Sequence, residues 1–153
     1  MKTFSIISLL VFGALFVLGC RNEPTRLPYL GNIEVNGTDT IYHTVPDIAL
    51  INQDSQSFRI SSIGNKVILA DFFFTSCPSI CPKVQKQMLR LYDRYKDDDR
   101  VMMISHTIDQ RNDSVEVLKR YAQNLEVDIH KWTFVTGQKD SIFDLADQYF
   151  VSV

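Results

Sequence analysis

Two cysteines in the stretch "TSCPSICP" are the residues of this sequence best suited to chemistry. Cys77 and Cys81 lie four positions apart, and a proline follows each of them. Thiolates form disulfides and bind soft metal ions such as Cu(I), so the pair could be a redox switch, a pair of metal ligands, or both. Pro82 lacks an amide hydrogen and suits the first turn of a helix, where that donor is not needed. The spacing therefore predicts Cys77 in a loop and Cys81 in the first helical turn, with Ser79 as the helix cap.

The spacing of the two cysteines favours a bound metal over a structural disulfide. Positions i and i+4 of a helix are about 5–6 Å apart between Cβ atoms, whereas a disulfide requires about 3.8 Å. A loop position for Cys77 can close this gap, so a disulfide stays possible, but two bonds to a central metal suit the longer spacing without strain. A disulfide across so short a loop would also stabilise the fold little. The start of a helix favours thiolates, and thiolates select Cu(I).

A third metal ligand would most naturally be a histidine, and the sequence offers three. His106 follows "VMMIS", so we expect it at the same edge of the sheet as the cysteines. We interpret it as a solvated strand-end residue that hydrogen-bonds to Asp109, with a supplementary metal ligand as the alternative. His43 is expected on the surface of an N-terminal hairpin, and His130 at the opposite end of the sheet.

The elements that must position these residues follow from the hydrophobic pattern. The continuous apolar run "VILADFFFT" predicts a strand buried on both faces. Two further strands, "RVMMISHTID" and "WTFVTG", alternate with amphipathic helical segments that begin at Pro82, at Asp113 or Ser114, and at Asp140-Ser141. This alternation predicts an α/β fold whose parallel strands all end at one edge, where ligands bind. Asn36-Gly37 predicts a hairpin turn ahead of this domain.

The N-terminal segment has the features of a lipoprotein signal peptide. Lys2 precedes an apolar run over 4–18, which is shorter than the about 20 residues of a membrane span, and "VLGC" ends at Cys20. We predict a signal peptide over 1–19, a lipid on Cys20, a tether and the start of the hairpin over 20–44, and the folded domain over 45–153; an uncleaved anchor is the alternative. Either reading predicts an exported domain on a bacterial membrane, facing the periplasm or the cell exterior.

Composition and cysteine count agree with one exported domain. The chain has 153 residues, is 45% hydrophobic and carries a net charge of −2, which suits a single domain with its own core. Its basic residues are scattered among acidic ones, so we expect no nucleic-acid partner. Lipidation of Cys20 would leave Cys77 and Cys81 as a pair in an oxidising compartment.

Three segments resemble successive segments of the Sco/SenC proteins, the copper chaperones of cytochrome oxidase assembly. They are "VILADFFFTSCPSICPKVQKQM", "VMMISHTIDQRNDSVEVLKRYAQNL" and "WTFVTG" with "IFDLADQYFVSV", and the similarity covers residues 45–153. The resemblance implies a thioredoxin-like fold with an N-terminal β-hairpin. It implies Cu(I) or Cu(II) held by Cys77, Cys81 and a histidine, and delivery to the binuclear copper centre of cytochrome c oxidase subunit II. A thiol-disulfide activity toward that subunit is the other role it implies.

The sequence departs from the family pattern in two places. Gln110 stands where the family usually has proline after Asp109. The family's ligand histidine, its final strands and its C-terminal helix would lie beyond Val153, so we expect a C-terminally truncated form with an exposed edge at the third long strand. The role of that histidine therefore cannot be transferred to His106.

The resulting hypothesis is a membrane-tethered copper chaperone rather than a turnover enzyme. A thioredoxin-like thiol-disulfide oxidoreductase is the main alternative. Such enzymes usually have two residues between the cysteines and a cis-proline facing them, whereas this chain has three residues and no proline after Pro82. A peroxide-reducing enzyme is less well supported, because Thr75 lacks the upstream proline of that chemistry.

Overall fold

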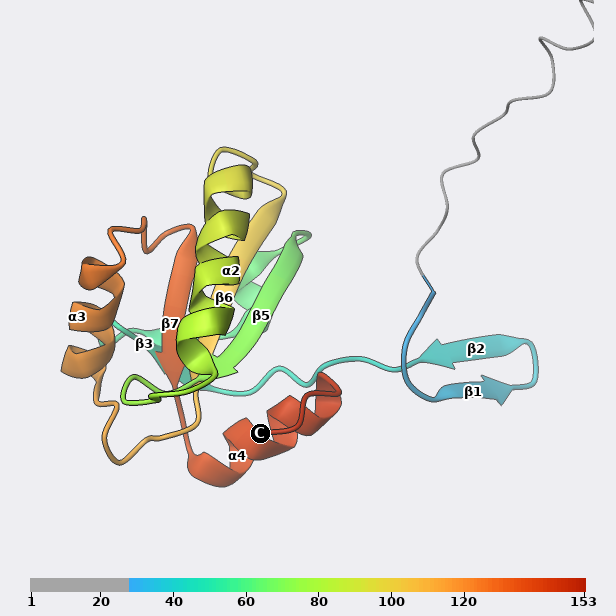
Figure 1. Cartoon of the computed structure of the whole chain (residues 1–153). Coiled ribbons are helices and arrows are strands. Elements are labelled where there is room, and N and C mark those ends of the chain that lie inside the picture. Colours follow the sequence, from blue (N-terminus) through green and yellow to red (C-terminus); the bar gives the residue numbers. More distant parts are fainter. Residues whose placement is uncertain (1–27) are drawn as a thin grey trace, which may run out of the picture. The chain divides into compact units, whose positions relative to one another are not determined.

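The computed structural model describes residues 28–153, which belong to two compact units, 1–43 and 44–153. The described part of the first unit is an antiparallel hairpin of β1 (Ile33–Asn36) and β2 (Asp39–Tyr42) (Figure 1). Gly37 adopts a φ of 65° in the turn, a conformation that glycine reaches without strain. The hairpin predicted from Asn36-Gly37 is confirmed. The predicted signal peptide and Cys20 lie outside the described residues.

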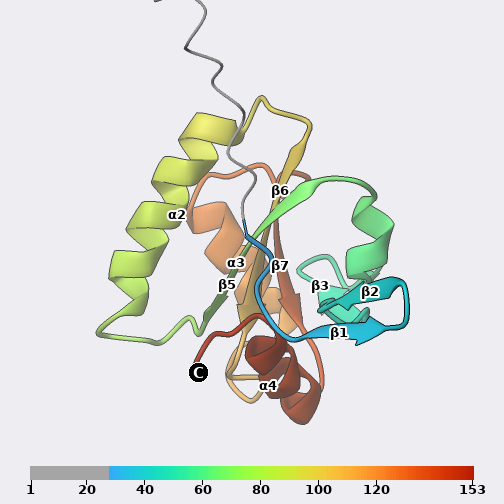
Figure 2. The ribbon, with the colours of Figure 1, turned by 90° about the vertical axis from the view of Figure 1, so that its right-hand side faces the viewer.

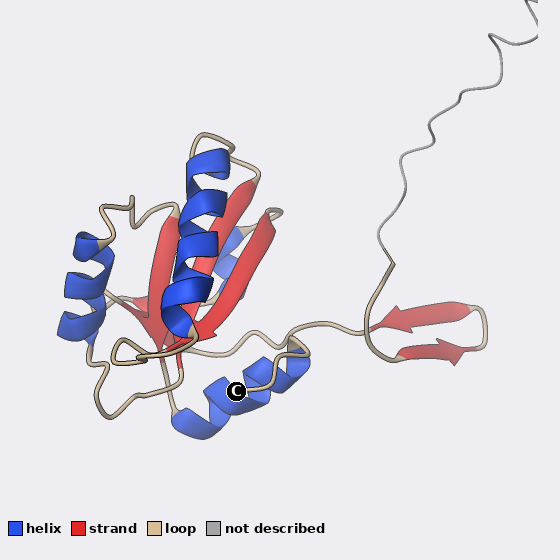
Figure 3. Ribbon diagram, in the orientation of Figure 1, coloured by secondary structure: helices blue, strands red, loops and turns tan. Residues whose placement is uncertain are grey.

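The second unit is built on a five-stranded sheet with the order β4–β3–β7–β6–β5. Figure 3 shows strands in red and helices in blue. The three long strands β5 (Val67–Phe73), β6 (Val101–Thr107) and β7 (Trp132–Thr136) are parallel, as predicted. Two short antiparallel strands, β3 (Leu50–Asn52) and β4 (Ser57–Phe58), continue the sheet beyond β7. The expectation of an open edge at the third long strand is therefore wrong: β5 is the outer long strand of the described sheet.

Helices cover both faces of this sheet. Side chains of α2 (Cys81–Tyr95) and α3 (Val115–Asn124) pack on one face, and those of α4 (Lys139–Gln148) and the short 3-10 helix η1 (Ile60–Ile63) pack on the other. Figure 2 shows α2 and the 3-10 helix on opposite sides of the strands. Among the described residues, no helix is both long enough and apolar enough to cross a membrane.

Each face of the sheet has its own hydrophobic core. We call the core under α2 and α3 the first core; its buried members are Phe73, Met88, Met103, Leu118, Ala122, Trp132 and Phe134. The second core lies under α4 and contains Leu50, Met102, Ile104, Val135 and Ile142. Because side chains alternate along a strand, odd-numbered positions of β6 face the first core and even-numbered positions face the second. This alternation decides which residues can approach the cysteines.

The helix starts only partly follow the caps that the sequence predicts. Ser114 caps α3 by accepting a hydrogen bond from the Val117 amide at 3.4 Å, as predicted. Helix α2 begins after Ile80 without a side-chain cap, so the prediction of Ser79 as its cap is wrong. Helix α4 begins one residue before Asp140, after Gln138.

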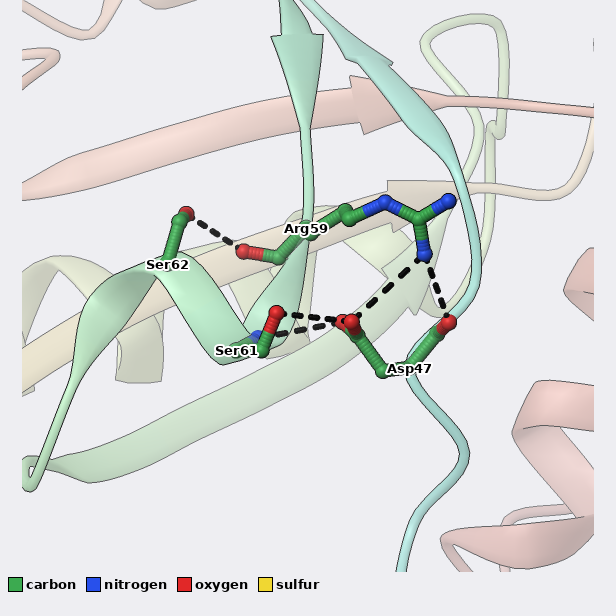
Figure 4. Close-up of polar contacts among 4 residues, drawn as sticks. All are labelled: Asp47, Arg59, Ser61 and Ser62. Carbon is green, nitrogen blue, oxygen red and sulfur yellow. Dashed lines mark hydrogen bonds and ion pairs between the residues drawn. The ribbon is translucent and has the colours of Figure 1, made fainter.

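Asp47 fixes the start of the second unit to the segment that follows β4 (Figure 4). Its carboxylate accepts hydrogen bonds from the Ser61 amide at 3.0 Å and the Ser61 hydroxyl at 2.6 Å. The Arg59 guanidinium donates to the Asp47 carbonyl at 3.0 Å and lies 3.5 Å from its carboxylate. These contacts hold the chain beside η1 before it enters β3.

Candidate functional site

The two cysteines lie at the connection between strand β5 of the parallel sheet and helix α2. Strand β5 ends at Phe73 and α2 begins at Cys81, with Cys77 in the turn between them. The Cys77 amide donates to the Phe74 carbonyl at 3.3 Å, which closes that turn. Pro82 occupies the first turn of α2. These placements confirm the loop and helix positions that the sequence predicts for the pair.

The Cys77 sulfur receives polar contacts from the start of the helix. The backbone amide of Cys81 donates to Cys77 Sγ at 3.4 Å, and the Ser79 hydroxyl lies 3.9 Å from the same sulfur. Both thiols are free. Cys77 is 9% exposed and Cys81 is half-buried, with Cys81 packed against the first core. Both cysteines thus lie beyond the carboxyl end of β5, and Cys81 is the more exposed of the two.

This environment makes the two thiols unequal. The hydrogen bond from the Cys81 thiol, aided by the Ser79 and Cys81 amides, lowers the pKa of Cys77 to about 6. Burial raises the pKa of Cys81, and the neighbouring Cys77 raises it further. At neutral pH Cys77 is therefore the thiolate and Cys81 the thiol, which suits Cys77 both as a soft metal ligand and as a nucleophile.

A buried carboxyl group lies beneath Cys81 on the first-core side of the sheet. Asp71 and Cys81 line one small cavity of about 10 Å³ together with Ser105 and Tyr121. The Ser105 hydroxyl donates to the Asp71 carboxylate and accepts from the Trp132 indole at 2.8 Å. Burial raises the pKa of Asp71 to about 6. Sequence reasoning missed this residue, although an aspartate inside the apolar run "VILADFFF" was a visible signal.

Asp113 is a second carboxylate that sequence reasoning assigned only as a possible helix cap. It is 1% exposed and accepts three hydrogen bonds. They come from the Thr75 amide at 3.0 Å, the Thr75 hydroxyl at 2.5 Å and the Thr107 hydroxyl at 2.5 Å. Thr75 lies two residues before Cys77, so the cysteine turn is tied directly to the loop after β6.

The structure contradicts the prediction for His106. The side chain is 0% exposed rather than solvated, and the carboxylate of Asp109 accepts hydrogen bonds from Asn112 instead. His106 is an even-numbered residue of β6 and stacks on Phe72, so it faces the second core. Cys81 packs on the first core. The imidazole and the cysteines therefore lie on opposite faces of the sheet, which argues against His106 as a ligand beside them.

The other two histidines do not belong to the cysteine turn: His130 lies at the opposite end of the sheet, and His43 belongs to the hairpin unit. His130 is exposed just before β7, at the end of the sheet opposite the cysteine turn, as predicted. His43 follows β2 and belongs to the hairpin unit. Within residues 28–153, no group of three or more His, Cys, Asp or Glu side chains is arranged to hold a metal ion. The described part of the chain offers a two-thiol donor set.

Comparison with known proteins identifies the family to which this chain belongs. The sequence model of the SCO1/SenC family matches residues 37–153, well over half of the chain. The chain belongs to the SCO1/SenC family. Membership of this family agrees with the α/β fold that the hydrophobic pattern predicts and with the thioredoxin-like fold that the resemblance implies.

Individual relatives of this Sco chain agree in sequence and in fold. The SCO1 protein homologue of Bacillus subtilis is 34% identical over 104 residues, which cover 67% of this chain and 54% of the relative. BsSco, a member of the Sco family of cytochrome c oxidase assembly proteins in which a disulfide switch was identified, is 32% identical. It superposes with a TM-score of 0.64 over 72% of this chain and 66% of BsSco. The chain thus spans about half to two thirds of the length of these relatives.

The fold also extends to more distant Sco structures. ScoI of Bradyrhizobium japonicum, solved with copper bound, has a TM-score of 0.60 with 22% identity, covering 69% of this chain and 66% of that one. This likeness shows the common fold.

Proposed function

We propose that this Sco protein binds copper as cargo through Cys77 and Cys81 and passes it to cytochrome c oxidase subunit II. The observation that carries the proposal is the pair of free thiols at the start of α2, of which Cys77 has a pKa lowered to about 6. A thiolate at neutral pH binds a soft cation without first losing a proton to solvent. The copper-bound structure of a fold relative supports copper as that cation.

The donor set favours Cu(I). Two sulfur atoms form a soft site, and soft thiolate ligands select Cu(I) over the harder divalent ions. Cys77 and Cys81 would hold the ion, and the described residues bring no third His, Cys, Asp or Glu side chain into a group with them. His106 is not that donor, because it faces the second core.

The oxidase partner and the membrane tether are further parts of the proposal. BsSco is described as a member of the Sco family of cytochrome c oxidase assembly proteins, which supports cytochrome c oxidase as the destination of the copper. Subunit II as the acceptor rests on the sequence resemblance to the Sco/SenC proteins. The lipobox-like "VLGC" supports a lipid on Cys20 and an exported domain facing the periplasm or the cell exterior. Mass spectrometry of the membrane-bound protein tests the tether: lipid anchoring predicts an N-terminal Cys20 that carries lipid, and a membrane-bound protein that retains residues 1–19 without lipid would refute it.

A thiol-disulfide exchange role has its own support in the unequal thiols. Cys77 is the thiolate and Cys81 holds its proton, as the attacking and resolving cysteines of an exchange reaction do. In this role Cys77 attacks a partner disulfide and releases one partner thiolate. Cys81 then loses its proton and attacks the mixed disulfide, so the protein is oxidised by two electrons and the partner is reduced.

The amount of Cu(I) bound by the reduced protein tests the copper proposal. We expect one Cu(I) per chain, held against a competing Cu(I) chelator, and loss of this copper in Cys77→Ser and in Cys81→Ser. His106→Phe is the matched control, since it changes a metal-binding residue type on the opposite face and fills the same space. Copper retained by both cysteine variants, or a folded wild-type protein that binds none, would overturn the proposal.

A further inference from the structure

Asp113 joins two loops that are distant in the sequence. Strands β5 and β6 are parallel neighbours with Phe73 opposite Thr107, and the Ile108 amide continues the ladder by donating to the Phe73 carbonyl at 2.9 Å. The cysteine turn and the segment leading into α3 therefore leave the sheet side by side. The Asp113 carboxylate lies between them and bonds to Thr75 on one side and Thr107 on the other.

The Asp113 carboxylate is itself held in place by the rest of the fold. Its own amide donates to the Asp109 carbonyl at 2.9 Å, and it directly precedes Ser114, the cap of α3. The Thr107 hydroxyl also accepts from the Asp109 amide at 3.1 Å. The position of Asp113 is thus set by the loop before α3, and the cysteine turn is attached to it through Thr75.

The burial of Asp113 means that its carboxylate depends on its hydrogen-bond donors. Asp113 is 1% exposed, and within the described residues it takes part in no ion pair. A buried carboxylate without a cationic partner is tolerated only when hydrogen bonds satisfy it. Two of its three donors come from Thr75. The turn that carries Cys77 therefore cannot move away from α3 without leaving a buried carboxylate short of donors.

We infer that Asp113 is the positioning residue of the cysteine pair, acting through Thr75 to hold Cys77 against the start of α2. With Thr75 fixed, the Cys77 sulfur stays 3.4 Å from the Cys81 amide. Without this anchor, the turn is free to carry the sulfur away from that donor. Asp113 and Thr75 position the thiols whether or not a metal is bound. Their importance for copper rests on the proposed function, in which the same two thiols bind the metal.

Thiol reactivity in the metal-free protein tests this inference without relying on copper. The probe is iodoacetamide, with alkylation of Cys77 followed by peptide mass spectrometry across a pH series. Thr75→Val removes the hydroxyl donor and keeps the side-chain shape, and Asp113→Asn removes the charge. For both we expect the half-point of Cys77 alkylation to rise by about one pH unit, which is about a tenfold slower reaction at pH 5.

Two matched variants separate positioning from a general loss of stability. Thr75→Ser keeps the hydroxyl and should restore the wild-type alkylation profile. Thr107→Val removes the other hydroxyl donor of the same carboxylate but lies on β6, so it should destabilise the fold and leave the Cys77 profile unchanged. Equal profiles for Thr75→Val and Thr75→Ser, or an equal shift in Thr107→Val, would overturn the inference. The Thr75 pair keeps the test valid even where Asp113→Asn fails to fold.

The copper assay then distinguishes this inference from the proposed function. If the alkylation profiles shift as expected and the wild-type protein binds no copper, the anchor stands and the copper proposal fails. If copper binds but the Thr75 and Asp113 variants react like the wild type, the copper proposal stands and the anchor fails.

Discussion

The imidazole ring of His106 stacks on the phenyl ring of Phe72, with 4.8 Å between the ring centroids and 19° between their planes. The two residues are directly opposite each other in β5 and β6, and both face the second core. One ring nitrogen, Nδ1, lies 3.3 Å from the Asp71 carbonyl, while Nε2 is buried without a hydrogen-bond partner. Burial lowers the pKa of His106 to about 4, so the ring is neutral at physiological pH.

His106 should make the fold sensitive to acid. The folded state holds the ring neutral down to about pH 4, whereas the unfolded chain binds a proton below about pH 6.5. The unfolded state thus binds more protons in this window, so the free energy of unfolding falls as the pH falls. A shift of this size corresponds to about 3 kcal/mol. This pH-dependent loss should be absent in His106→Phe, so the stability of the variant relative to the wild type should rise by about 3 kcal/mol from pH 7.5 to pH 4. Denaturant unfolding of both proteins at the two pH values measures this change. A difference that does not change with pH would contradict the assignment.

Asp71 should act in the opposite direction. Its pKa is raised to about 6 in the folded state by burial, from 3.8. Between these values the folded state binds more protons than the unfolded one, so stability is lost as the pH rises through about 6. Asp71→Asn keeps an oxygen that accepts from Ser105 and should gain about 3 kcal/mol relative to the wild type between pH 4 and pH 7.5. Urea unfolding at those two pH values measures this gain. Equal stability differences at both would show that the carboxyl group is not desolvated.

The low pKa of Cys77 should depend on the Cys81 thiol, which is its largest cause. In the wild type, the rate of Cys77 alkylation should reach half of its maximum near pH 6. Cys81→Ala removes the donor, and the half-point should move up toward 9, the ordinary value for the thiol. Cys81→Ser is the matched control, because its hydroxyl can still donate to the Cys77 thiolate. If the Ala and Ser variants share one half-point, the helix amides rather than the Cys81 side chain set the pKa.

The order of elements and the position of the cysteines could be read from the sequence because local signals determine both. The apolar run before Cys77, Pro82 in the following turn and the amphipathic spacing beyond it each act within a few residues. The Asn36-Gly37 turn is equally local. These signals predicted the parallel strands, the cysteine turn and the hairpin.

The environment of the site could not be read in the same way, because it depends on side-chain contacts between distant segments. "VMMISHT" is buried along its whole length, so the alternation of polar and apolar residues that marks a face is missing, and the sequence wrongly predicts a solvated His106. Asp113 and Thr75 are 38 residues apart, and only the pairing of β5 with β6 brings them together. The residue type of Ser79 favours a helix cap, but the chain enters α2 through Ile80.

The attachment of Thr75 to Asp113 also limits the conformational entropy of the cysteine segment. The segment is fixed at one end by that carboxylate and at the other by the first turn of α2. Ordering the backbone of one residue costs about 1–2 kcal/mol of conformational entropy. The residues of this segment are already ordered in the folded protein before any ligand binds. Capture of a metal ion, or closure of a bond between the two sulfurs, therefore orders little additional chain. With the backbone fixed in this way, the two sulfurs would meet a metal ion or each other by movements of their side chains alone.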